Sequence, residues 1–198
     1  MRERGALLSS MILVMLASML VGAGTVAYFN DTETVSGNTF SAGTLDLEVN
    51  DENPWTSTLI SVSNMKPGDT GEVTIELENL GSLDGYVCMW IKDVTNSPGD
   101  TPEPEDTPDN GELGANIKIT IWQDDGDNVL EDGEEVYVNG ETLDNLDGEK
   151  VVTNKPLSAG GTVYIGFSWE IPSDVGNEIM DDSVTFTIEF ALTQEEQP

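Results

Sequence analysis

The chain of 198 residues carries 38 acidic residues against seven basic ones, for a formal net charge of −31, and it contains one cysteine and no histidine. A charge of this sign disfavours nucleic acid and anionic lipid as partners, because both bind to a basic face. The lack of histidine excludes Ser–His and Cys–His catalytic pairs and His-ligated zinc, so the composition favours a protein that is not an enzyme.

Residues 1–27 have the pattern of a signal peptide. Arg2 and Arg4 form a short basic start, and no charged residue follows in the rest of this segment. The uncharged stretch ends on small residues, so we expect cleavage between Ala27 and Tyr28. The alternative is a retained membrane anchor, because about 20 apolar residues suffice to span a bilayer. If cleavage occurs, the chain meets the membrane only through this segment before it is removed.

The acidic excess grows when the signal segment is removed. Without residues 1–27 the chain keeps five lysines against 37 acidic residues, a formal charge of −32. Such a chain suits concentrated salt, where the screening length falls to about 3 Å at 1 M, and this indicates a halophilic source, an archaeon of salt-rich habitats. Divalent-cation binding is a second reason for so much acid, and the two are compatible.

Beyond the signal segment, apolar residues alternate with polar ones at a period of two, the pattern of strands that face a core on one side and water on the other. The expected strands are 45–49, 59–63, 73–77, 86–94, 117–121, 136–138, 150–153, 163–169 and 184–192. Many short strands separated by turn residues predict an all-β fold, a sandwich or a barrel. Cys88 lies within an apolar strand and is expected to be a buried thiol.

The length beyond residue 27 suits one domain, which we place at 41–194. Two stretches are expected to be loop insertions, 95–115 because it is rich in proline and poor in apolar side chains, and 123–135 because it is densely acidic. Residues 195–198 form a short polar tail that is expected to fray.

Five short motifs, in order along the chain, resemble those of the TasA/camelysin family of secreted fibre proteins. They are 24–31 at the processing site, 40–47 in the first core strand, 65–69 at a Lys-Pro-Gly-Asp corner, 78–83 at an Asn-x-Gly-Ser-Leu turn and 186–194 in the closing strand. The resemblance implies a single jelly-roll-like antiparallel β-sandwich, exported through a dedicated signal peptidase. It also implies that the N-terminal segment of one subunit inserts as a donor strand into the next.

The segment 28–40 is compatible with that role. Tyr28, Phe29, Val35 and Phe40 are apolar residues in an otherwise polar stretch, which is too polar to found a core strand alone. In β-strand addition, main-chain hydrogen bonds give affinity and alternating pockets give register. The alternative is that the segment pairs with its own sheet or stays disordered.

Some relatives of camelysin type are described as proteases, and we do not extend that activity to this chain. It has no histidine, no metalloprotease helix motif and no nucleophile elbow. No catalytic residue and no certain cofactor are therefore predicted.

One acidic run fits a calcium loop in part. When the run is aligned with the twelve-residue calcium loop, Asp124, Asn128, Asp132 and Glu135 place side-chain oxygens at positions 1, 5, 9 and 12. The backbone carbonyl of Leu130 falls at position 7.

Two positions of this loop do not match. The turn glycine is replaced by Val129, and Gly126 offers no side-chain oxygen at position 3, although Asp125 or Asp127 could supply the missing ligand. The alternative is an ordinary solvated hairpin loop in a chain that is acidic throughout.

Together these observations predict a secreted structural subunit of an extracellular filament, pilus or biofilm-matrix fibre, which polymerises with copies of itself. The alternative is a monomeric or membrane-anchored adhesive or S-layer-associated module of the cell surface, which a retained hydrophobic segment would favour. A surface enzyme ranks third, because acidic pairs alone cannot be told from solubilising charge.

The charge gives the first testable prediction. Because screening suppresses repulsion between carboxylates, the Tm of the purified protein should rise steeply as KCl is increased from low to multimolar concentration. Thermal melts monitored by circular dichroism measure it, and a Tm that does not change over this range would rule out the halophilic interpretation.

Overall fold

The computed structural model describes residues 42–55, 65–98 and 110–197. The signal segment 1–27, the segment 28–40 and the expected strand 59–63 lie outside these residues. Within the described part of the chain, no helix combines the length and the apolar character needed to cross a bilayer. Residues from 42 onward form one compact unit.

The described residues fold almost entirely into strands. The strands are β1 (Leu47–Val49), β2 (Thr70–Asn79), β3 (Gly85–Ser97), β4 (Lys118–Asp124), β5 (Val136–Thr142), β6 (Lys150–Leu157), β7 (Thr162–Glu170) and β8 (Ser183–Thr193). One helical turn, α2 (Leu113–Asn116), and two 3₁₀ turns, η1 (Leu143–Leu146) and η2 (Asn177–Ile179), join them. Each expected strand within the described residues is confirmed, most of them with longer bounds.

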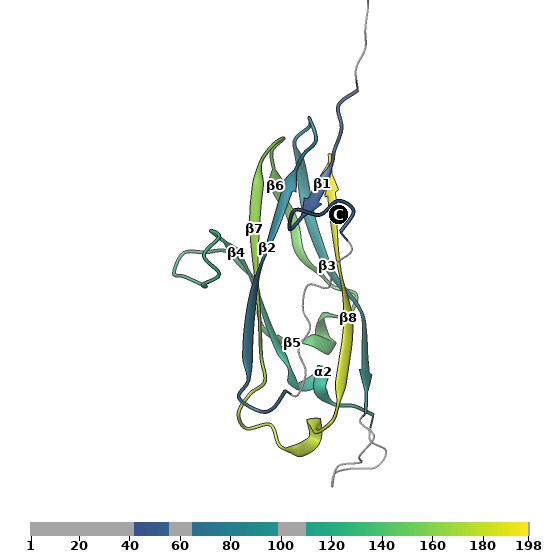
Figure 1. Cartoon of the computed structure of the whole chain (residues 1–198), viewed down its shortest axis with the longest axis vertical. Helices are drawn as coiled ribbons and strands as arrows, with labels where there is room; N and C mark the ends of the chain where they lie inside the picture. The colour runs from purple at the N-terminus through teal and green to yellow at the C-terminus, as the bar shows by residue number, and fades with distance from the viewer. Residues whose placement is uncertain (1–41, 56–64, 99–109, 198) are drawn as a thin grey trace, which may run out of the picture. The chain divides into compact units, whose positions relative to one another are not determined.

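The strands form two antiparallel sheets that pack face to face as a sandwich, which confirms the predicted fold class (Figure 1). The five-stranded sheet has the order β1-β2-β7-β4-β5, and the three-stranded sheet has the order β6-β3-β8. Most connections cross from one sheet to the other, so neighbours in a sheet are distant in sequence. The chain therefore closes the sandwich with long-range pairs such as β2–β7 and β3–β8.

The core fills the space between the two sheets, and the period of two decides which residues enter it. Ile75 and Leu77 of β2 are fully buried, whereas Glu76 between them reaches the outer face. On β7, Ile165 and Phe167 are buried in the same way. Burying one such side chain contributes about 1.5–3 kcal/mol to the free energy of folding. The buried inward side chains together therefore supply the main hydrophobic contribution to folding.

The sulfhydryl of Cys88 is buried, as the sequence predicted. It lies between β3 and β6, where its Sγ is 3.4 Å from Oδ1 and 3.5 Å from the backbone nitrogen of Asn154. A thiol enclosed in this way acts as a small core side chain.

The structure corrects both loop boundaries. β3 continues through Ser97, and the end of the expected loop 95–115 folds into α2, because Leu113 packs into the core and the Gly114 N–H donates to Oδ1 of Asn96 at 2.7 Å. The second loop begins later than predicted, since β4 includes residues 123 and 124. What leaves the sheet is 125–135, which we call the acidic excursion.

The tail is attached more firmly than its polarity indicates. Gln197 exchanges two hydrogen bonds with Asn154 on β6: its N–H donates to Oδ1 at 2.8 Å, and its carbonyl accepts from Nδ2 at 2.9 Å. The expectation of a freely fraying tail is therefore wrong up to residue 197.

The outer face of the five-stranded sheet carries one large buried side chain. Trp122 is 1% exposed although it points away from the core between the sheets, and its partner across the β4–β7 ladder is Gly166. A Cβ built on Gly166 would overlap the indole ring. The glycine therefore leaves the space in which the ring lies.

This contact predicts the effect of one added methyl group. Gly166→Ala should displace Trp122 and lower the free energy of unfolding by about 1–3 kcal/mol, the usual cost of overpacking. Urea denaturation measures the change, and Ser168→Ala, on the same face of β7 but without an added atom, is the control. Equal stability of the Gly166→Ala variant and the wild type would contradict the packing argument.

Candidate functional site

The chain enters the sandwich through a set of hydrogen bonds that we call the N-terminal clamp, formed by Thr44 and the turn 79–83. The Thr44 carbonyl accepts from the N–H groups of Ser82 at 2.9 Å and Leu83 at 3.1 Å. In return the Thr44 N–H donates to Oγ of Ser82 at 3.0 Å. The position at which the N-terminal segment joins the domain is thereby fixed.

The turn itself is held by a buried amide. Asn79 is fully buried; its Nδ2 donates to the Leu83 carbonyl at 2.8 Å, and its Oδ1 accepts from the Gly81 N–H at 3.0 Å. A side chain at Gly81 would overlap the Thr44 carbonyl oxygen. The Asn-x-Gly-Ser-Leu motif is therefore needed for the close approach of two backbone segments.

The Lys-Pro-Gly-Asp corner starts β2. Gly68 has φ +88, and the Asp69 N–H donates to the Lys66 carbonyl at 3.0 Å, as in a type II turn. The Asp69 carboxylate accepts from the side chain of Lys66 at 2.6 Å and from its backbone N–H at 3.0 Å, and these bonds lower the pKa of Asp69.

Two strand edges are open on one side of the sandwich. Among the described residues β8 pairs with β3 alone, and β1 covers just the last three residues of β2. Trp55, which follows β1, meets Phe190 of β8 with ring centroids 6.2 Å apart, whereas β5 contacts β6 at the other side. The β8 edge and the open part of the β2 edge therefore share one side.

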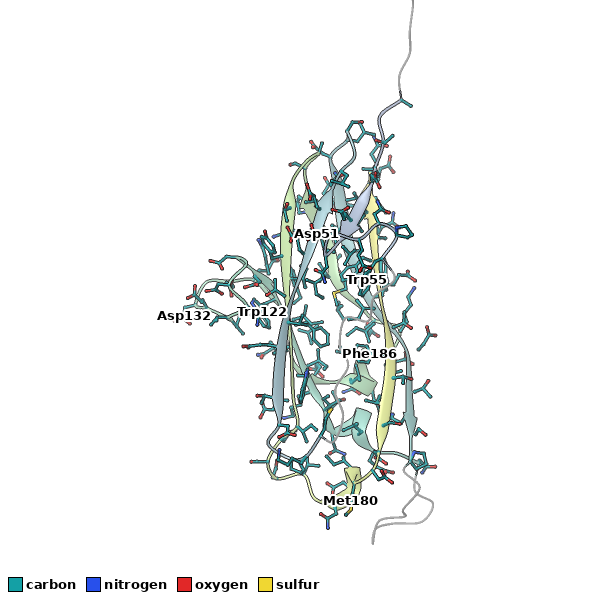
Figure 2. All side chains as sticks on the ribbon, in the orientation of Figure 1. Asp51, Trp55, Trp122, Asp132, Met180 and Phe186 are labelled. Carbon is teal, nitrogen blue, oxygen red and sulfur yellow. The ribbon has the colours of Figure 1, made fainter. Side chains whose placement is uncertain are left out.

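The apolar face of β8 is incompletely covered. Its five inward side chains are all half-buried, whereas Ile75 and Leu77 of β2 and Ile165 and Phe167 of β7 are fully buried: Val184, Phe186, Ile188, Phe190 and Leu192. Phe186 stacks on Phe167 with centroids 6.3 Å apart, and both Trp55 and Phe186 can be followed in Figure 2. A strand that pairs on one side alone among the described residues and carries a partly covered apolar face is the kind of edge to which another strand can add.

The residues predicted for polymerisation cannot be placed on this surface. Tyr28, Phe29, Val35 and Phe40, together with the expected cleavage position at Ala27, lie outside the described residues.

The outer face near β1 is crowded with carboxylates. Partial loss of water contact, followed by repulsion from Glu78, Asp51, Asp46 and Glu76, raises the pKa of Glu48. A carboxyl whose pKa is raised on folding favours the folded state while it is protonated, and that contribution is lost as pH rises through its pKa. Like-charge repulsion on this face is thus a local source of the expected salt dependence.

The acidic excursion begins at a carboxylate with little access to water. Asp124, the last residue of β4, is 3% exposed. Its Oδ2 accepts from the hydroxyl of Thr74 on β2 at 2.7 Å and from the Asn128 N–H at 3.1 Å. Asp124 thus connects the excursion to a strand that is 50 residues away in sequence.

The structure brings together part of the predicted calcium set. Carboxylate oxygens of Asp124, Asp125 and Asp127 all lie within 4.8 Å of one another. Leu130, Asp132 and Glu135 do not belong to this group and are exposed, with Asp132 near the tip of the excursion in Figure 2.

Two predicted ligands have other contacts. Oε2 of Glu135 lies 3.3 Å from Nζ of Lys155 and accepts from the hydroxyl of Tyr137 at 3.4 Å. Burial, and after it the charge of Glu135, raises the pKa of Tyr137. The side chain of Asn128 contacts Oγ1 of Thr74 at 2.9 Å.

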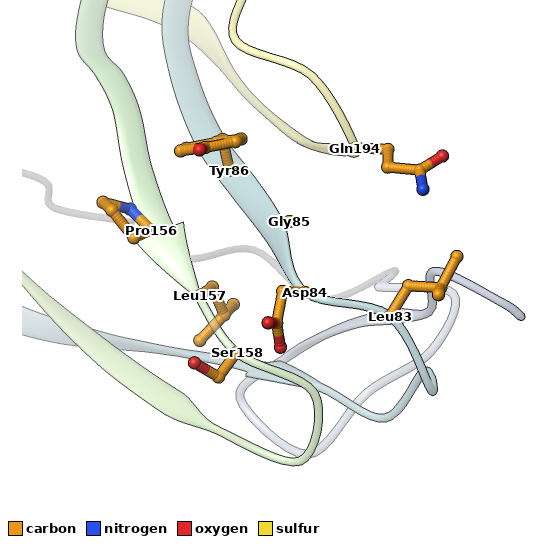
Figure 3. Close-up of a pocket in the computed structure, with 8 residues that line it drawn as sticks. All are labelled: Leu83, Asp84, Gly85, Tyr86, Pro156, Leu157, Ser158 and Gln194. Carbon is orange, nitrogen blue, oxygen red and sulfur yellow. The ribbon is translucent and has the colours of Figure 1, made fainter.

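A pocket of about 440 Å³ opens at the end of the three-stranded sheet, where β3 begins and β6 ends (Figure 3). Its lining residues are Leu83, Asp84, Gly85, Tyr86, Pro156, Leu157, Ser158 and Gln194. The one carboxylate among them, that of Asp84, accepts from the Ala159 N–H at 2.9 Å.

Comparison with known proteins gives two matches. The model of the camelysin metallo-endopeptidase family matches residues 6–197. A protein of Bacillus subtilis (strain 168) described as "Major biofilm matrix component" is 30% identical over 159 residues, which cover 74% of this chain and 58% of that protein. The aligned part thus spans little more than half the length of this relative.

The family description implies a catalytic metal, so we asked whether the residues fit one. The chain offers no histidine, and the thiol of Cys88 is enclosed between β3 and β6. The one metal-compatible group among the described residues consists of three aspartates. Catalytic zinc sites use histidine or cysteine ligands around an open position, so these residues do not fit such a centre.

The sequence does not predict the roles of two residues, Asn79 in the N-terminal clamp and Thr74 beside the acidic excursion. Asn79 belongs to the Asn-x-Gly-Ser-Leu motif, but nothing in the sequence predicts that its side chain is completely buried. Thr74 alternates with apolar residues like any outward strand position, and nothing in the sequence links it to Asp124.

The N-terminal clamp yields a prediction. Asn79→Ala should leave the Leu83 carbonyl and the Gly81 N–H without their buried partner and lower the free energy of unfolding by about 1–3 kcal/mol. Asn145→Ala, at an exposed position, is the control. Urea denaturation measures both, and an Asn79→Ala variant as stable as the control would show that the buried amide does not hold the turn.

Proposed function

Since this chain belongs to the TasA/camelysin family, we propose that it is a structural subunit of an extracellular fibre that polymerises by donor-strand exchange. The single observation that carries the proposal is the edge strand β8, whose apolar face is half-buried along its whole length. A subunit with this edge buries more apolar surface when a further strand is added than it can alone.

The segment 28–40 matches β8 in length. β8 has eleven residues, and the segment 28–40 is long enough to pair with all of them. Phe29 and Val35 are six positions apart, so an extended segment presents both on one face. That face supplies side chains toward the incompletely covered apolar residues of β8.

The N-terminal clamp supports the same assignment. It fixes Thr44, the point just after the proposed donor segment, against the turn that follows β2. A fixed entry point into the domain would let the segment before it pair with another copy of the chain. Self-association through this route gives a head-to-tail homopolymer.

Location and processing complete the proposal. A chain with an N-terminal signal segment, cut between Ala27 and Tyr28 by a dedicated signal peptidase, would reach the cell surface or the surrounding matrix. The description of the Bacillus relative as a biofilm matrix component supports an extracellular role. The donor set does not fit a catalytic zinc centre, which supports a structural role in place of proteolysis.

Deletion of Tyr28–Thr39 tests the assembly. The truncated protein should stay folded and monomeric, because its sandwich core is formed from residues beyond 42, and it should form no fibres. Electron microscopy and size-exclusion chromatography provide the readouts. Fibres of normal width from the truncated protein would refute the mechanism and favour another assembly surface.

Complementation with a peptide sharpens the test. A synthetic peptide of residues 28–40 should bind the truncated protein and raise its Tm, whereas the same peptide with Phe29→Asp should not, since a buried unpaired charge costs several kcal/mol. On the acceptor side, Ile188→Asp should weaken peptide binding, with Thr187→Asp on the exposed face of β8 as the matched control. A monomer that binds neither peptide would instead support a surface module that acts alone.

A further inference from the structure

The carboxylate of Asp124 has one oxygen that the protein does not satisfy. Its Oδ2 takes part in two hydrogen bonds, but its Oδ1 is buried and has no hydrogen-bond partner. The three ion pairs found among the described residues do not include Asp124. A buried carboxylate oxygen without a donor or a cation is unfavourable, and the described residues of the chain supply neither to Asp124 Oδ1.

Two further carboxylates lie beside this oxygen. Oxygens of Asp125 and Asp127, both exposed, are within 4.8 Å of the Asp124 carboxylate and of each other. Oxygens that share one calcium ion at 2.3–2.6 Å lie at most about 5 Å apart, so all three can bind the same ion. Without a cation, this approach brings three like charges together.

The site is held in place by three parts of the fold. Asp124 is paired with Tyr164 across the β4–β7 ladder, and Thr74 of β2 binds its other oxygen. Gly126, with φ +106, turns the chain back over the ring of Tyr164. The buried carboxylate is therefore fixed before any ion arrives, which lowers the ordering cost of binding.

We propose that Asp124, Asp125 and Asp127 form a divalent-cation site for Ca²⁺ at the start of the acidic excursion. All three donors are oxygens, the ligand type of hard cations. Ca²⁺ accepts six to eight oxygens in irregular arrangements, with water filling the remaining positions, whereas Mg²⁺ requires a near-ideal octahedron. An irregular cluster with one buried oxygen and two exposed carboxylates favours Ca²⁺.

This site differs from the twelve-residue loop expected from spacing. It retains Asp124, but Asp125 and Asp127 take the place of Asp132 and Glu135. The comparison with the twelve-residue loop offered Asp125 and Asp127 only as a source of a missing ligand. It closes the first turn of the excursion onto the sheet and leaves its tip free. The site is independent of the proposed polymerisation.

Terbium luminescence and thermal melts test the site on the full-length protein in about 1 M KCl, which suppresses general screening effects. Tb³⁺ bound at the site and excited through the nearby aromatic side chains should luminesce, and added Ca²⁺ should displace it and reduce the signal. Mg²⁺ should displace Tb³⁺ at least about tenfold less well than Ca²⁺ does. A hundredfold excess of Ca²⁺ over its Kd should raise the Tm by about 5 °C or more.

Matched variants separate the site from diffuse charge. Asp125→Asn with Asp127→Asn changes two exposed residues and should keep the fold while weakening Ca²⁺ binding at least about tenfold; Asp124→Asn should abolish it. Asp132→Asn removes a charge from the same excursion outside the cluster and should leave the affinity unchanged. No displacement by Ca²⁺, or equal responses in all variants, would overturn the proposal.

Discussion

The incompletely covered apolar face of β8 is the constraint on which the rest of the structure depends. The two sheets have unequal numbers of strands, and the narrower one ends at β8, so five large side chains on that strand are half-buried. Among the described residues, Trp55 and Phe167 are the aromatic side chains that contact this face, through Phe190 and Phe186. Most of the other inward positions, such as Ile75, Leu77 and Ile165, are buried completely, and under the proposed function an added strand would cover the β8 face.

The N-terminal clamp and the outer face follow from the same architecture. Thr44, just before β1, lies against the turn that follows β2, and Gly81, the buried amide of Asn79 and the hydroxyl of Ser82 hold it there. On the outer face, carboxylates gather because the inner positions are taken by apolar residues. The carboxylates around Glu48 and the cluster at Asp124 are two local results of that division.

Periodicity was sufficient to predict the strands, the fold class and the burial of Cys88, because alternation alone fixes which residues face a core. It could not predict that the inward side chains of β8 are half-buried while Ile75 and Leu77 of β2 are fully buried, since both strands alternate in the same way. That difference depends on strand order, which is set by pairs far apart in sequence. Leu113 anchors a helical turn at the end of a stretch whose overall composition indicates a loop. The spacing of a twelve-residue calcium loop predicted Asp124 correctly as part of the acidic cluster, but it favoured Asp132 and Glu135 over Asp125 and Asp127. The hydrogen bond between Thr74 and Asp124 joins two distant strands, so no spacing within the loop could predict it.

Hydrogen exchange on soluble subunits and on assembled fibres gives the most direct test of the central claim that β8 is the acceptor edge. Backbone amides of β8 that do not face β3 should exchange rapidly in the monomer and become protected at least about tenfold in the fibre, while amides at the β5 edge should change little. Unchanged exchange along β8, or new protection confined to β5, would contradict the account.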